Sequence, residues 1–163
     1  MSKQNFIKKP NLGQQAASIR RLYPDFEVQL EKYNQLIVYG YAKPTARSCL
    51  YNFKLVYRHN KRPVIHILDP VLERGLKGEK PPHLYGDWSL CLYLPGIKEF
   101  TDYDRLSDTI IPWISLWLYY YEDWLTNGNV WNGGGIHPNV MRKTEKKPYI
   151  RSSISKSISF VKK

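Results

Sequence analysis

The side chains of this sequence that could carry nucleophilic chemistry centre on Cys91. It lies in HLYGDWSLCLYL (residues 83–94), between two leucines, after a polar turn and eight residues beyond His83. Loops stay accessible and carry function more often than strands do, so we expect Cys91 to be reachable. A thiol with an ordinary pKa of about 8.5 supplies enough thiolate at neutral pH for acyl transfer. Cys91 is therefore the candidate nucleophile, although LCLYL is also typical of a core strand.

The second cysteine, Cys49, is expected to serve packing. It begins a predicted strand next to Leu50 and Tyr51. Two distant cysteines cannot form a disulfide scaffold, and no C-x-x-C pair or Cys/His cluster has the spacing of a zinc site. We expect both thiols to be reduced, with no metal or cofactor bound.

The four histidines divide between structure and function. His66 lies in VIHIL and is expected to be a strand or core residue, whereas His59 falls in a predicted turn. His83 follows two prolines that restrict the backbone, and it could orient the loop, donate to a developing oxyanion or hold the turn. His137 lies in GGGIHP, where a turn-stabilising role competes with a supporting role at the site.

The elements that must position these residues follow from patterning. Asn11 caps a predicted helix with Gln15, Ala16, Ile19 and Leu22 on one face, and Pro24 stops it. Alternating segments at 27–42, 48–60 and 63–71 predict an antiparallel meander of three or four strands, with a turn at residues 59–62. Residues 75–100 are rich in Gly and Pro and predict an ordered loop.

A second helix is predicted over 110–128. Thr109 is its expected cap, Pro112 falls in the first turn and Gly128 ends it. Its expected buried stripe consists of Ile114, Trp117, Leu118 and Tyr121. The order of helix, meander, loop with Cys91, and helix predicts an α+β domain.

Length and charge limit the classes of protein that fit. The chain has 163 residues and a net charge of +11, and residues 140–163 hold eight Lys or Arg and one Glu, a net +7. We therefore expect one domain at 1–139 and a basic tail at 140–163, either solvated or a docking segment for an acidic partner or nucleic acid. There is no apolar run of membrane-spanning length and no signal-peptide pattern, so we expect a cytoplasmic protein with no membrane partner.

The residues between Pro81 and Pro138 resemble a known family. PPHLYGDWSLCLYLP followed by WLYYYEDWLTNGNVWNGGGIHP is similar to the bacterial E2-like proteins of type II CBASS, the cyclic-oligonucleotide anti-phage defence systems. The resemblance spans roughly residues 15–138 and implies the ubiquitin-conjugating (E2) fold. Its ordered features are His83, Cys91, Trp124, Trp131 and residues 133–138. The short, stand-alone form of these proteins fits best.

The resemblance implies a role for each site residue. Cys91 would form a thioester with the C-terminal carboxylate of a cGAS-like nucleotidyltransferase and so raise its cyclic-nucleotide synthesis. His83 matches the histidine of the eukaryotic His-Pro-Asn motif, but Leu84 and Tyr85 stand in place of Pro and Asn. Asp87 or a backbone donor is the candidate substitute for the missing asparagine, unless the enzyme stops at the thioester. Asp87, Trp88 and His137 are the expected supporting residues.

The sequence also lacks a motif for binding a nucleotide. No P-loop or G-x-G-x-x-G motif is present, so a separate E1-like activating enzyme or an unorthodox activation step is implied.

Three other functions are alternatives to the acyl carrier. They are a non-catalytic E2-like adaptor, a nucleic-acid-binding module, and a cysteine peptidase using Cys91 with His83 or His137. Nucleic acid is the less expected partner, and the peptidase lacks an apparent Asn or Asp to orient the histidine.

Overall fold

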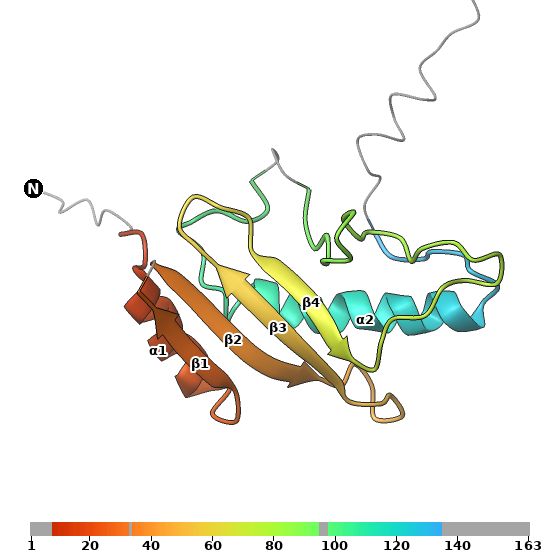
Figure 1. Cartoon of the computed structure of the whole chain (residues 1–163), viewed down its shortest axis with the longest axis horizontal. Coiled ribbons are helices and arrows are strands. Elements are labelled where there is room, and N and C mark those ends of the chain that lie inside the picture. The colour runs from red at the N-terminus through yellow and green to blue at the C-terminus, as the bar shows by residue number, and fades with distance from the viewer. Residues whose placement is uncertain (1–7, 33, 95–97, 135–163) are drawn as a thin grey trace, which may run out of the picture.

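The part of the chain that the structure describes folds into an α+β structure of two helices and one sheet (Figure 1). The computed structural model describes residues 8–32, 34–94 and 98–134. The elements, in chain order, are α1 (Leu12–Leu22), β1 (Glu27–Glu31), β2 (Gln35–Ala42), β3 (Tyr51–Tyr57), β4 (Val64–Asp69) and α2 (Ile110–Thr126). The four strands form an antiparallel sheet in the order β1-β2-β3-β4, which confirms the predicted meander.

One face of the sheet is apolar because alternate side chains of each strand point to it. The pairings Val28↔Val38, Val38↔Leu55 and Leu55↔Ile65 set a row of buried residues across all four strands. In β3 the residues Tyr51, Phe53, Leu55 and Tyr57 are all buried, as the alternation predicts. This face forms the core with both helices.

Helix α1 begins with a complete capping box. The Asn11 side chain accepts from the Gln14 N–H, and the Gln14 side chain accepts from the Asn11 N–H. The predicted inner face of α1 is buried at Gln15, Ala16 and Ile19. Leu22, the last residue of that face, is 47% exposed because the helix ends there. Buried Gln15 bonds the Asp104 carbonyl and the Leu106 N–H, so it ties the loop before α2 to α1.

Helix α2 lies behind the sheet in Figure 1 and buries its predicted stripe. Trp124 is also fully buried, at 1% exposure. Thr109 precedes the helix as expected, but its hydroxyl bonds the Arg105 carbonyl and not a helix N–H, so it gives no side-chain cap. Gly128 ends the helix with a φ of +79°, a conformation that glycine adopts without strain.

The segment after α2 turns back along the molecule. In Figure 1 it runs beside the loop that follows β4, and the Leu76 N–H donates to the Asn129 side chain. This return brings residues 128–134 towards the loop that carries Cys91. None of the described helices has the length and apolarity needed to cross a membrane.

Candidate active site

Cys91 lies at the end of a short hairpin formed by residues 83–91. The Tyr85 N–H donates to the Ser89 carbonyl, and the Cys91 N–H donates to the His83 carbonyl. Between these bonds Leu84 pairs with Leu90 in an antiparallel bridge. The Leu90 N–H also donates to the Ile65 carbonyl in β4, so the hairpin is attached to the edge of the sheet.

The turn of this hairpin is held by side chains that the sequence had marked as supporting. The Trp88 N–H donates to the Tyr85 carbonyl, and Trp88 itself has a φ of +65°. This is the three-residue loop that ends in a left-handed residue. The Trp88 ring lies 4.7 Å from the Lys80 ammonium and 5.1 Å from the Arg74 guanidinium. Such cation–π contacts help to offset the strain of a left-handed tryptophan.

Asp87 serves the same turn. Its carboxylate accepts hydrogen bonds from the Ser89 hydroxyl at 2.7 Å and from the Ser89 N–H at 3.1 Å. These bonds lower the pKa of Asp87. The backbone carbonyl of Asp87 also contacts His66 Nε2 at 3.1 Å. The carboxylate thus holds the turn through Ser89.

Cys91 is less accessible than a loop position suggests. It is 8% exposed, and its Sγ lies 3.7 Å from the Tyr93 carbonyl. Burial follows from the attachment of the hairpin to β4, because the neighbouring Ser89 and Leu90 are carried into the core. Cys49, expected to be a packing residue, is instead exposed just before β3. The expectations of an accessible Cys91 and a packed Cys49 are therefore both wrong.

Tyr85 and Arg62 complete the surroundings of the thiol. The Tyr85 side chain interacts with the Cys91 thiol. The Arg62 guanidinium lies 3.8 Å from the centre of the Tyr85 ring, and its Nη1 donates to the Ser89 hydroxyl at 3.2 Å. Burial and the contact with Cys91 raise the pKa of Tyr85, while the Arg62 charge opposes the rise. A neutral phenol and a fixed cation thus flank the candidate nucleophile.

His83 is positioned by the chain that returns from α2. Its ring centre lies 5.2 Å from that of Trp131, which in turn packs on Trp117 at 5.9 Å. Like Trp88, His83 has a positive φ, of +55°. The backbone bond to Cys91 and the ring contact with Trp131 fix His83 from two sides. His137 lies outside the described residues, as does the whole of the tail at 140–163.

Close packing around Trp131 depends on Gly133. A Cβ at Gly133 would lie 2.6 Å from Trp131 Nε1 and 2.9 Å from Tyr120 Cγ. Both are ring atoms, which cannot move aside without shifting the ring. A Cβ at Gly134 would meet no atom within 4 Å. Packing therefore requires glycine at position 133 but not at position 134.

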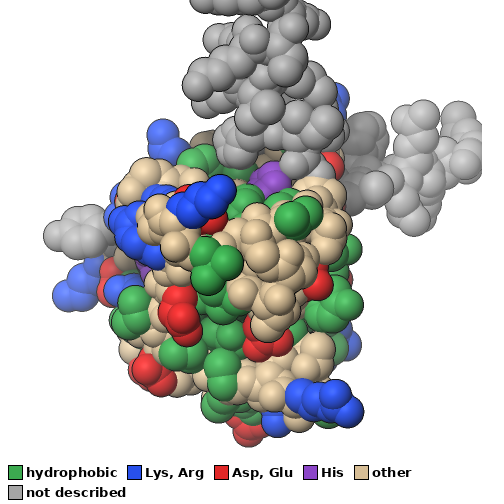
Figure 2. Space-filling view, turned by 90° about the vertical axis from the view of Figure 1, so that its right-hand side faces the viewer, with side chains coloured by type: hydrophobic (Ala, Val, Ile, Leu, Met, Phe, Trp, Pro, Cys, Tyr) green, Lys and Arg blue, Asp and Glu red, His purple; other side chains and the backbone are tan. Residues whose placement is uncertain are grey.

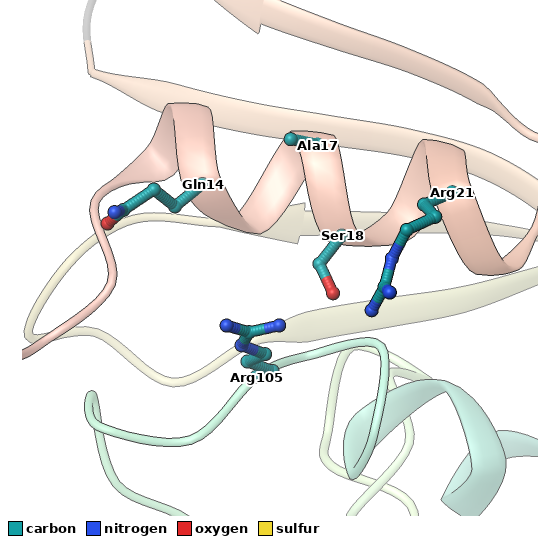
Figure 3. A pocket seen from close by; sticks show the side chains of 5 residues that line it. All are labelled: Gln14, Ala17, Ser18, Arg21 and Arg105. Atoms are coloured by element: carbon teal, nitrogen blue, oxygen red, sulfur yellow. The ribbon is translucent and has the colours of Figure 1, made fainter.

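A shallow hollow of about 330 Å³ lies elsewhere, between α1 and the loop before α2. In Figure 3, Ser18 and Arg21 point from α1 towards Arg105. The Ser18 hydroxyl is already bonded to that of Ser107 at 2.8 Å. The hollow is at the α1 side of the sheet, whereas Cys91 is at the β4 edge, so it is not part of the cysteine site.

Charge on the visible end of the molecule is mixed. Figure 2 shows hydrophobic and acidic side chains sharing the middle of this face, with Lys and Arg mostly at its margins. A duplex or single strand needs a continuous basic surface to release counterions, and this face does not offer one. Among residues 8–32, 34–94 and 98–134, no group of three or more His, Cys, Asp and Glu side chains could hold a metal ion.

Comparison with known families identifies the chain. A family model described as "Type II CBASS E2 protein" matches residues 15–138. The chain belongs to this family. The match confirms the resemblance drawn from the sequence and gives the protein a conjugation-like role in CBASS defence, in association with the CBASS nucleotidyltransferase system. The α+β architecture is compatible with an E2-like fold. No curated protein matches the chain significantly.

Sequence reasoning missed the role of Arg62. Arg62 is the last residue of the predicted turn at 59–62, and nothing in its local pattern points to Tyr85 and Ser89, which lie 23 and 27 positions later. The signal that could have found it is the position directly before Pro63, at the start of an edge strand. In the sequence, Tyr85 stands out only as the residue in place of an asparagine, and Trp131 only as part of the resemblance.

Proposed function

We propose that this type II CBASS E2 protein is an acyl carrier whose Cys91 forms a thioester with the C-terminus of a cGAS-like nucleotidyltransferase. The conjugation would raise the synthesis of cyclic nucleotides in anti-phage defence. The observation that carries the proposal is the placement of Cys91 at the end of a hairpin that is bonded to β4 and flanked by His83, Tyr85 and Arg62. Such fixed placement is what nucleophilic catalysis requires.

The proposed step is acyl transfer from an activated carboxyl group. An acyl adenylate or thioester made by a separate E1-like enzyme would supply it, because the sequence holds no nucleotide-binding motif. The Cys91 thiol loses its proton to solvent or a base, and a bond forms between Sγ and the carbonyl carbon. The bond to the leaving group breaks, and the group departs with its electron pair. No oxidant or metal ion is consumed.

Burial of Cys91 bears on how the acyl group arrives. At 8% exposure the thiol is covered in the free protein, so the C-terminal segment of the partner has to displace this cover. The same burial favours the second candidate function, a non-catalytic adaptor in which Cys91 is a packing residue. The adaptor would bind and activate the nucleotidyltransferase without any covalent bond.

Co-expression with the nucleotidyltransferase of the same operon separates these functions. Wild type, Cys91→Ala and Cys91→Ser are compared on non-reducing gels with and without added thiol. We expect a thiol-labile adduct in wild type, no adduct in Cys91→Ala, and a thiol-resistant ester in Cys91→Ser. An intact complex with equal activation and no adduct in all three would instead support the adaptor.

A further inference from the structure

Tyr85 lies on the same side of the hairpin as Cys91. The bonds between Tyr85 and Ser89 and between His83 and Cys91 frame the Leu84↔Leu90 bridge. Side chains alternate across such a ladder, so Tyr85, Ser89 and Cys91 share the face opposite Leu84 and Leu90. Tyr85 and Cys91 are diagonal neighbours on that face, a relation in which an aromatic side chain reaches its partner.

Arg62 holds the Tyr85 ring in place from outside the hairpin. Its guanidinium covers the ring at 3.8 Å and bonds the hydroxyl of Ser89 on the same face. The two contacts fix Arg62 between two residues of the hairpin, and a planar guanidinium stacked on an aromatic ring restricts both groups. Tyr85 is therefore a preorganised donor beside the sulfur.

Two other groups near the thiol, the Tyr93 carbonyl and the Asp87 carboxylate, are unsuited to donate a hydrogen bond. The Tyr93 backbone group that faces Sγ is a carbonyl, which only accepts. The Asp87 carboxylate accepts from Ser89 at the far end of the hairpin. The phenol of Tyr85 keeps its proton at neutral pH, because burial and the contact with Cys91 raise its pKa.

We propose that the Tyr85 hydroxyl donates a hydrogen bond to the oxyanion that forms when Cys91 attacks an acyl carbonyl, with Arg62 as the positioning residue for Tyr85. The inference rests on the proposed acyl-carrier function. The phenol keeps its proton throughout, and the negative charge on the carbonyl oxygen is lost again when the leaving group departs. A donor fixed before the charge develops stabilises the transition state more than the ground state.

The test compares two reactions of the same thiol in the purified full chain. p-Nitrophenyl acetate acetylates Cys91 through an oxyanion and releases p-nitrophenolate, whereas iodoacetamide alkylates the sulfur without forming one. A Cys49→Ala background is used, since Cys49 is exposed and would react with both reagents. Peptide mass mapping assigns each product to Cys91.

We expect Tyr85→Phe to slow acetylation by about 100-fold, the order measured for loss of one oxyanion donor, and to leave alkylation within twofold of wild type. Tyr93→Phe, which removes a hydroxyl from another half-buried tyrosine near the thiol, is the matched control and should change neither rate. Equal slowing of both reactions would overturn the proposal, since it would mean that Tyr85 only shapes access to the sulfur. Unchanged acetylation, or a wild-type Cys91 that takes up no acetyl group, would overturn it too.

A double-mutant cycle tests the role of Arg62. Arg62→Ala should slow acetylation in the Tyr85 protein but have no further effect in Tyr85→Phe, because a positioning residue acts only through the group it positions. Additive losses would contradict that role. Failure of the proposed acyl-carrier function would give a different result. Cys91 would still be acetylated at a rate that depends on Tyr85, but it would form no adduct with the nucleotidyltransferase.

Discussion

Close approach of the chain to one indole ring governs the surroundings of His83. The Trp131 ring packs against the rings of His83, Trp117 and Tyr120, and a Cβ at Gly133 would lie 2.6 Å from its Nε1. A single added methyl group at this point must displace a ring that supports the histidine of the candidate site.

We expect Gly133→Ala to destabilise the fold by about 1–3 kcal/mol, the usual cost of overpacking a tight site, and to slow the reactions of Cys91. Gly134→Ala is the matched control, because its Cβ meets nothing within 4 Å. Urea unfolding followed by tryptophan fluorescence measures the difference. Equal stability of the two variants would show that Trp131 is not held by this contact.

At the residue scale, sequence reasoning reached the groups that are close in the chain. His83 and Cys91 are eight positions apart, and both are candidate site residues in the sequence; the bond that joins them is between backbone atoms. Arg62 and Trp131 lie 29 and 40 positions from Cys91. Their contacts depend on how β4 and the segment after α2 pack, which no local pattern encodes.

At the scale of elements, the hairpin that carries Cys91 owes its shape to a left-handed tryptophan. Trp88 has a φ of +65°. Its Cβ makes this left-handed conformation sterically unfavourable. Glycine adopts this conformation readily, whereas alanine pays about 1 kcal/mol or more.

We therefore expect Trp88→Gly to be more stable than Trp88→Ala by about 1 kcal/mol, the reverse of the order found at ordinary positions. Both variants lose the contacts with Lys80 and Arg74, so their difference isolates the backbone. The pair Asp87→Gly and Asp87→Ala at the adjacent turn position, where φ is not positive, should show no gain for glycine. Thermal unfolding of the four proteins checks the order, and alanine above glycine at position 88 would refute it.

The elements themselves were largely predictable, for physical reasons. Strand β3 alternates strictly, and α2 carries an apolar stripe with Pro112 in its first turn and glycine after its end. The hairpin was not predicted, since GDWS lacks the Asn-Gly or Asp-Gly signal of a tight turn. The sequence pattern predicts a loop here and therefore an accessible Cys91, whereas the attached hairpin buries it.

At the scale of the whole molecule, one carboxylate joins three distant parts of the chain. Asp102 accepts hydrogen bonds from Lys9 before α1, from the Tyr57 hydroxyl in β3 and from the Asn60 N–H in the turn after β3. Burial favours the neutral acid, but these three bonds together outweigh it and lower the pKa of Asp102.

A lowered pKa makes stability depend on pH in one direction. The contribution of Asp102 is fully present above the ordinary carboxyl pKa of about 4 and is lost as the pH falls through the lower value in the folded protein. We expect the gap in unfolding free energy between wild type and Asp102→Asn to stay constant from pH 7 to 5 and to shrink below pH 4. Urea unfolding across this range measures it, and a gap independent of pH would contradict the assignment.

The order of the strands has a further consequence, for contacts between copies of the protein. β4 is covered at its edge by the Cys91 hairpin, whereas β1 pairs with β2 alone among the strands of the described residues. An unpaired edge invites a strand from another molecule. If two copies of β1 paired antiparallel about Gln29, Glu27 of each would stand opposite Glu31 of the other. Like charges in directly opposed positions repel, so this short, acidic strand disfavours self-association through the sheet at neutral pH.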